Sequence, residues 1–330
     1  MPVTIQSARP DQWREVAHLI YHSTNAWYEK NRGFRVFAGD PDDVLLFCRT
    51  YAALDGAENL LIAWDSDQQK IVGSCFVHPR KTHLALGILN VHPESFGQRV
   101  AVKLLTRIVE LAREQQKALR LVSSAMNLDS FSLYSKFGFA PYAVYQDLMI
   151  PDFQPENAQL PEAARALLPR IRLALSSDVP AIEALDRELT GLEHAQDYAY
   201  FIRNPDGAWK TWVLESDLTA TERISTSGES ALPKLDGVLS SVRDPGSCML
   251  GPGLMRNEDQ MLALIHTAYS ALRDSKPVFL VPSTCTDALR TLYRWGTINT
   301  EIHLGQSLEF AGGARPTVRG LIMPTFMPES

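Results

Sequence analysis

Long hydrophobic runs are missing from this chain of 330 residues. No apolar stretch approaches the roughly 18 residues that suggest a membrane-spanning helix, so a membrane is not an expected partner. The N-terminal segment MPVTIQSARPDQW also lacks a basic region followed by an apolar one. Secretion by a signal peptide is therefore not expected either.

Cysteine is scarce as well. The chain holds four cysteines that are scattered without a close pair, namely Cys48, Cys75, Cys248 and Cys285. This spacing argues against a disulfide framework and shows no pattern of metal ligands, so no metal is expected. It is typical of reduced, mostly buried thiols and favours a cytoplasmic location.

The chain also has no excess of positive charge. The chain has 32 Lys and Arg residues against 38 Asp and Glu residues, a net charge of -6. Nucleic acid is not an expected partner, because proteins that bind it carry a dense basic face. Neither a G-x-S-x-G elbow nor a G-x-x-x-x-G-K-[ST] loop occurs. Hydrolase chemistry and nucleotide phosphoryl transfer are thereby disfavoured.

The length indicates two domains, because one domain commonly holds about 100–200 residues. Residues 151–169 are rich in proline, alanine and polar residues, which is typical of a linker and leaves room for one short helix. After this segment the expected order of strands and helices begins again. We therefore predict a duplicated pair of domains at residues 1–150 and 170–330.

The most informative stretch lies in the first half. An apolar, strand-like run ends at Val91-His92-Pro93, and a turn containing Gly97 follows. The segment 98–116 then repeats apolar residues at helical spacing: Val100, Leu104, Leu105, Ile108, Leu111 and Ala112. A strand that enters a helix through such a turn exposes backbone N–H groups at the positive end of the helix dipole, a setting that receives phosphate.

A second strand is expected at 118–125, followed by a short helix. In and around that helix stands a characteristic set of residues: Asn127, Ser130, Leu133, Tyr134, Gly138 and Phe139. Together with the V-H-P turn and Gly97, this order resembles the GNAT superfamily of acyl-CoA N-acyltransferases. The resemblance implies an α/β (α+β) fold of two tandem GNAT-like domains, each a mixed, mostly antiparallel twisted sheet flanked by helices.

The same resemblance implies that the first domain is an N-acetyltransferase with acetyl-CoA as the acyl donor. It places the pantetheine arm along the strand before the turn and the pyrophosphate on the loop amides. The predicted cofactor-binding residues are Leu89, Asn90, Val91, Gly97, Gln98, Arg99, Val100, Ala101, Asn127 and Ser130. The alternative is that Gly97 only shapes a turn before a packing helix.

Two loop positions depart from the family pattern. Phe96 stands where Gln or Arg is usual, and Arg99 stands where glycine lets the backbone approach the pyrophosphate. Arg99 is compatible with an ion pair to a cofactor phosphate, and equally with a solvated side chain at a helix N-terminus.

By the resemblance, Tyr134 is the predicted catalytic residue, which protonates the departing thiolate. A packing role beside Phe137 and Phe139 is the alternative. The general base stays open, because the strand before the turn carries no acid. The nearest titratable groups are His83 and His92, and histidine has a suitable pKa, but a surface or capping role is favoured for each.

The sequence leaves the acceptor open, as a small-molecule or protein amine. Residues 25–37 interleave aromatic and charged side chains, which fits either an acceptor pocket or an aromatic core cluster. The second half lacks the loop, and Gly253 is the position where a tight turn would expose amides there. The competing hypothesis is a non-catalytic acyl-CoA-binding or scaffold protein with this fold. A homodimer is compatible with both.

Overall fold

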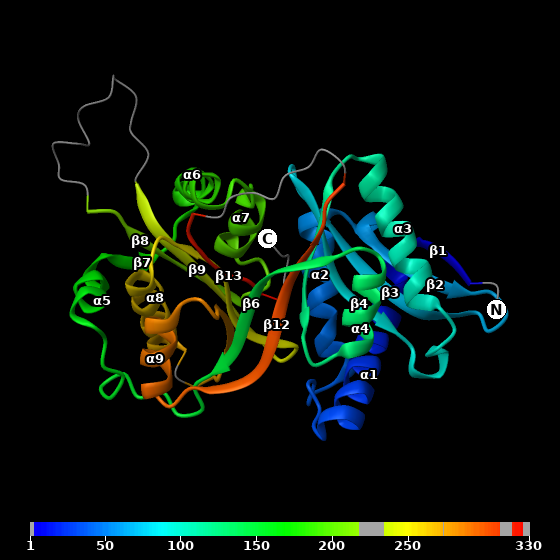
Figure 1. The fold of residues 1–330 in the computed structure, drawn as a ribbon, viewed down its shortest axis with the longest axis horizontal. Coiled ribbons are helices and arrows are strands. Elements are labelled where there is room, and N and C mark those ends of the chain that lie inside the picture. Colours follow the sequence, from blue (N-terminus) through cyan, green and yellow to red (C-terminus); the bar gives the residue numbers. More distant parts are fainter. Residues whose placement is uncertain (1–2, 218–233, 273, 311–318, 326–330) are drawn as a thin grey trace.

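The computed structural model describes residues 3–217, 234–272, 274–310 and 319–325 (Figure 1). The first half runs in the order β1 (Val3–Ser7), α1 (Trp13–Arg32), α2 (Leu45–Asp55), β2 (Leu60–Asp65), β3 (Lys70–Pro79), β4 (His83–Val91), α3 (Val100–Glu114), β5 (Ala118–Ser124), α4 (Leu128–Lys136) and β6 (Ala140–Met149).

The second half repeats this order of elements. It comprises β7 (Ile171–Leu173), α6 (Val179–Thr190), α7 (Ala195–Arg203), β8 (Trp209–Glu215), β9 (Leu235–Asp244), β10 (Ser247–Met255), α8 (Glu258–Ala271), β11 (Val278–Pro282), α9 (Thr286–Arg294) and β12 (Ile298–Leu308). The short helix expected between the halves is α5 (Glu162–Leu167), and β13 (Leu321–Met323) follows β12. The duplicated order inferred from the sequence is therefore present.

The helices follow from the sequence pattern. In α3 the residues at helical spacing form a buried stripe, with Val100, Leu104 and Ile108 each at most 1% exposed. α1 ends at Gly33, whose left-handed φ of 76° forms the C-terminal cap. No helix in the described ranges is both long and apolar enough to cross a membrane.

The two halves exchange their last equivalent strands. The sheet runs β1-β2-β3-β4-β5-β12-β6-β11-β10-β9-β8-β7, with β13 beside β10. Strand β12 of the second half pairs with β5 of the first, and β6 of the first half pairs with β11 of the second. β6 and β12 also pair with each other, antiparallel, at the centre of the molecule (Figure 1). Each half therefore completes the sheet of the other.

The helices cover the sheet in two layers. Helices α1 and α2 share one continuous apolar core with α6 and α7, so this core crosses from one half to the other. On the opposite face, α3 and α4 cover the first half and α8 and α9 cover the second, each pair with its own core. One layer thus joins the halves, while the other serves each half separately.

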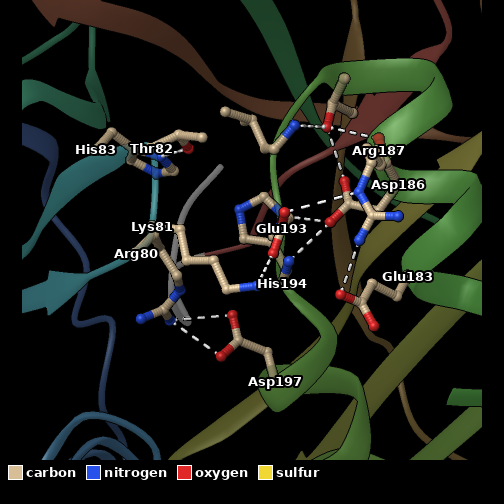
Figure 2. A network of polar contacts seen from close by, with 12 residues as sticks. Arg80, Lys81, Thr82, His83, Glu183, Asp186, Arg187, Glu193, His194 and Asp197 are labelled. Carbon is tan, nitrogen blue, oxygen red and sulfur yellow. Dashed lines mark hydrogen bonds and ion pairs between the residues drawn. The ribbon is translucent and has the colours of Figure 1, made fainter. Parts of the chain in front are cut away.

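A buried ion-pair network also joins the halves. Arg80 follows β3, and its side chain is 1% exposed. Its guanidinium donates to Asp55 of α2 over 2.6 Å and to both carboxylate oxygens of Asp197 of α7 over 3.0 Å. Figure 2 shows Arg80 facing Asp197, with Lys81 reaching Glu193 beside them. The guanidinium lies between two buried carboxylates, and the His78 ring also contacts Asp55 over 2.6 Å, so neither carboxylate is buried without a partner.

Replacing Arg80 by methionine should therefore lower the free energy of unfolding by about 3–5 kcal/mol, the range for breaking a buried ion pair by removal of one partner. Denaturant titration of the variant measures this loss. Arg9→Met is the matched control, because Arg9 pairs with Asp11 at the exposed surface, and its midpoint should stay unchanged. A loss below about 1 kcal/mol for Arg80→Met would show that the network contributes no net stability at the interface.

The strand exchange predicts that the halves do not fold independently. Fragment 1–150 lacks β12, so the edge of β5 and the apolar surface beside it stay uncovered. Expressed alone, the fragment should aggregate or self-associate, whereas co-expression with fragment 151–330 should give a one-to-one complex in size-exclusion chromatography. A monomeric fragment 1–150 that unfolds cooperatively, with the midpoint of the full chain, would contradict the exchange.

Candidate functional site

The first half contains a groove between two strands that separate. β4 and β5 pair in parallel only from His83 opposite Ala118 to Ala85 opposite Arg120. β4 then continues to Val91 with a register shift against β3, which marks a β-bulge. Beyond Ala85, the edge of β4 that faces β5 has no strand partner among the described residues. Its backbone N–H and C=O groups are therefore available to a ligand that lies along the strand.

Three of the predicted cofactor-binding residues lie on this open edge. Leu89, Asn90 and Val91 pair with β3 through their other edge. Leu89 and Val91 pack against the core under α3. The Asn90 side chain points to the opposite face, where its Nδ2 donates to Ser23 Oγ over 2.6 Å and to Thr24 Oγ1 over 3.2 Å. The groove thus has α3 and α4 on one face and α1 on the other.

The loop before α3 forms a nest of unpaired amides. After a short 3-10 turn, Gly97 and Arg99 both adopt left-handed φ angles, of 78° and 62°, and the first bond within the helix runs from Lys103 N to Arg99 O. Five N–H groups donate no hydrogen bond within the described ranges: that of Gly97 and the consecutive four of Arg99, Val100, Ala101 and Val102. Such a concavity at a helix N-terminus binds anions. Gln98 differs, since its N–H donates to Ser95 O.

Arg99 preserves the backbone shape that glycine would give. Its left-handed conformation costs an L-residue about 1–2 kcal/mol, and its side chain is exposed, without an ion pair among the described residues. A Cβ atom built on Gly97 would meet nothing within 4 Å, so the surface in front of the nest is open. The departure from the family pattern at Arg99 therefore leaves the amide nest intact.

The residues of α4 divide between a cap and the core. Asn127 caps the helix, since its Oδ1 accepts the Ser130 N–H over 3.1 Å. Both residues therefore help to form the start of α4. The Tyr134 ring packs against Phe139 with centroids 5.7 Å apart. Burial first, and then the nearby Cys75, raise the pKa of the Tyr134 phenol above its ordinary value. Tyr134 therefore keeps its proton at any ordinary pH.

The two histidines nearest in sequence to the turn lie at opposite ends of β4. His83 begins β4, at the end of the strand far from Val91, and its ring contacts His194 of the second half. A nine-residue strand spans about 26 Å, so His83 lies far from the turn after Val91, which fits its alternative as a residue without a catalytic role. His92 caps the turn after β4, where its Nδ1 accepts the Glu94 N–H. Partial burial, and then Lys70, lower the pKa of His92.

A buried acidic cluster that the sequence did not reveal lies beside α1. Asp147 of β6 and Glu301 and His303 of β12 each place one side-chain atom within 4.8 Å of the others. The Glu301 carboxylate accepts hydrogen bonds from Tyr28 Oη over 2.7 Å and from Ser124 Oγ. Residues on β12 could not be connected with α1 from the sequence, because only the strand exchange brings them together.

Electrostatics in this cluster are unusual. Burial, and then the neighbouring Glu301, raise the pKa of Asp147 to about 7. The same two causes, in the same order, raise the pKa of Tyr28. Burial lowers the pKa of His303 to about 4, so this imidazole is neutral near pH 7. Residues of the segment 25–37 therefore have two different surroundings. Tyr28 faces the cluster, whereas Phe37 packs against the core.

The equivalent groove of the second half is filled by the chain itself. β10 and β11 pair in parallel over only two residues. β13 lies beside β10 where the strands separate, with Met323 opposite Gly253 and Leu321 opposite Met255, and it also contacts β11. The sequence left open a tight turn with exposed amides at Gly253. The structure has no turn there, because Gly253 lies inside β10 and also pairs with Leu239 of β9.

The start of α8 is also unlike that of α3. Asn257 caps α8 directly, with its side chain accepting the Gln260 N–H, and no left-handed loop precedes the helix. Glu258 and Asp259 occupy the first turn, so negative charge stands where a phosphate would bind. These residues line a cavity of about 550 Å³ together with Asp287. The second half thus has the topology of the first without its amide nest.

Comparison with known proteins agrees with this description. The family model for acetyltransferase (GNAT) proteins matches residues 20–139. A candidate acetyltransferase from Pyrococcus horikoshii has a TM-score of 0.72 at 13% identity, over 99% of this chain and 95% of that one. A GCN5-related N-acetyltransferase from Sphaerobacter thermophilus has a TM-score of 0.61 at 16% identity, over 94% of this chain and 97% of that one.

A tandem GNAT protein from the clavulanic acid biosynthesis pathway has a TM-score of 0.60 at 14% identity, over 94% of this chain and 99% of that one. No curated protein matches the sequence. The structural likenesses extend over both halves and, at these identities, concern the fold. The acetyltransferase (GNAT) family model thus matches most of the first half, and the chain as a whole has the tandem GNAT fold.

Proposed function

We propose that the chain is an N-acetyltransferase that moves the acetyl group of acetyl-CoA to an amine, with its single cofactor site in the first half. The observation that supports this most directly is the open edge of β4 ending in the amide nest at Gly97. The nest suits the pyrophosphate and the edge suits the peptide-like pantetheine arm. In the second half β13 covers the corresponding strand edge, and no amide nest precedes α8.

In this proposal the cofactor amides of pantetheine pair with the backbone of Leu89 to Val91. The amides of Gly97, Arg99, Val100 and Ala101 hold the pyrophosphate, and the exposed Arg99 guanidinium adds a charge-assisted contact. Asn127 supports the site by fixing the start of α4, which carries Tyr134. Ser130 and Gln98 shape the backbone and contribute no free amide to the phosphate.

The chemistry is direct acyl transfer. An unprotonated amine attacks the thioester carbonyl, the C–N bond forms and the C–S bond breaks. The amine loses one proton to a base, and the departing CoA thiolate takes one proton to leave as a thiol. Tyr134 is the candidate for the second role, because its phenol carries a proton and lies in the core against which Leu89 packs.

The first test concerns the cofactor. Calorimetric titration with acetyl-CoA should give one site per chain. Gly97→Val should weaken this binding by about tenfold or more, because a β-branched residue disfavours the left-handed φ that shapes the nest. Gly296→Val is the matched control: Gly296 also has a positive φ and open space at its Cβ position, but it lies after α9. Two sites, or equal effects of the two variants, would contradict the proposal.

The second test concerns Tyr134. Tyr134→Phe should reduce kcat by about 10²-fold, within the range for loss of a general acid, while the Kd for acetyl-CoA stays within twofold. Thiol release over a panel of amines measures the rate. Tyr293→Phe is the control, because Tyr293 holds the equivalent place on α9. Undiminished kcat in Tyr134→Phe would remove the proton-donor role. Binding without thiol release in the unaltered protein would favour the non-catalytic acyl-CoA-binding alternative.

A further inference from the structure

Two carboxylates face each other at the junction of the exchanged strands. The side chains of Asp147, on β6, and Glu301, on β12, are 7% and 8% exposed. One oxygen of each lies within 4.8 Å of the other and of a His303 nitrogen. Burying two like charges at this separation is costly unless a positive group lies between them.

The hydrogen bonds of the two acids are unequal. Both Glu301 oxygens are engaged, one by Tyr28 and one by Ser124. Asp147 Oδ1 is buried and has no hydrogen-bond partner. Among the described residues, the permanent cation paired with the cluster is Arg32, whose Nη1 lies 3.8 Å from Glu301. One guanidinium does not balance two carboxylates, so the cluster keeps an unused acceptor and an uncompensated negative charge.

The cluster lies one helical turn from the groove. On α1, Thr24 contacts Asn90 of β4 over 3.2 Å, and Tyr28 contacts Glu301 over 2.7 Å. These two helix positions are four residues apart, a rise of about 6 Å. Helix α1 thus bridges the open part of β4 and the acidic cluster. Ser124, which donates to Glu301, ends β5 on the other side of the groove.

We propose that Glu301, delivered to the first half by the exchanged strand β12, forms with Asp147 the site that binds a protonated primary amine as the acetyl acceptor. This inference rests on the proposed function and names its substrate class as cationic amines. The acceptor site is then composite, since α1 and β6 belong to the first half and β12 to the second.

The cluster suits an ammonium group better than a metal ion. An ammonium donates up to three hydrogen bonds, which match Asp147 Oδ1 and the remaining lone pairs of Glu301. A divalent metal would require direct coordination by Glu301, whose oxygens already accept from two hydroxyl groups, with Arg32 close by. In the acyl transfer, the bound R–NH₃⁺ passes one proton to a carboxylate of the pair before the neutral amine attacks the thioester.

The experiment compares amine binding in Glu301→Gln and Asp147→Asn with the unaltered full chain. Calorimetry uses n-butylamine, spermidine and Nα-acetyl-lysine amide, with n-butanol as the uncharged probe. At least one amine should bind, and each substitution should weaken that amine about tenfold or more without changing the Kd for acetyl-CoA. Glu114→Gln on α3, whose side chain is 60% exposed, is the matched control. Failure of all three amines to bind, or equal effects of Glu114→Gln and Glu301→Gln, would overturn the proposal.

The pH dependence gives a readout that a packing role would not produce. Because burial and the neighbouring Glu301 raise the pKa of Asp147 to about 7, amine affinity should increase as the pH rises through 7 and Asp147 ionises. In Glu301→Gln this midpoint should fall, since the neighbouring negative charge is gone. An unchanged midpoint would contradict the coupling. Thermal midpoints at or above that of the unaltered chain verify folding, because each substitution removes a like-charge repulsion.

The outcomes also separate this site from the proposed function. Amine binding that is lost in Glu301→Gln, with no thiol release in the unaltered chain, would retain the amine site and reject the transferase. Thiol release that proceeds unchanged in Glu301→Gln would reject the amine site and retain the transferase. Tight binding of Zn²⁺ or Mn²⁺ that both substitutions abolish would assign the cluster to a metal and overturn the proposal.

Discussion

The antiparallel pairing of β6 with β12 is the constraint on which the rest of the structure depends. It joins two five-stranded arrays into one sheet, because each exchanged strand covers the open edge of the opposite half. The same pairing sets the register that brings His303 opposite Tyr145 and Ser124, and so fixes Glu301 and Asp147 beside α1. A site that needs residues from both halves cannot exist without this pairing. The duplication and the function are thereby connected through backbone hydrogen bonds.

The two halves show how one topology can hold different chemistry. In both, a parallel strand pair separates and a helix begins near the opening. In the first half the opening is free and the helix is preceded by two left-handed residues that expose a run of amides. In the second, β13 forms hydrogen bonds along the opening and Asn257 with two acids closes the helix start. The backbone groups that would bind a cofactor are therefore satisfied internally, which stabilises the second half at the expense of a site.

The sequence predicted those features that depend on local order. The turn that contains Gly97 after Val91 and the helix after it are set by residues within about ten positions of one another, and the structure has both. It failed where distant strands meet. Glu301 lies 273 residues from Tyr28, and no local pattern encodes which strand fills the gap beside β5. Gly253 could not be placed for the same reason: a glycine in a turn and a glycine packed beneath Leu239 have the same local sequence signal.

Two pairs of buried acids among the described residues differ in their partners, and the difference separates a structural pair from a candidate functional one. Asp55 and Asp197 share the Arg80 guanidinium, whose bonds to them are 2.6 and 3.0 Å long, and His78 also contacts Asp55. Among the described residues Asp147 and Glu301 share no such cation, and Asp147 Oδ1 has no hydrogen-bond partner. A protein under selection for stability alone would neutralise this second pair, because uncompensated buried charge opposes folding. A site for a cationic substrate requires uncompensated negative charge next to a groove that the substrate can enter. The substrate then supplies the missing positive charge when it binds.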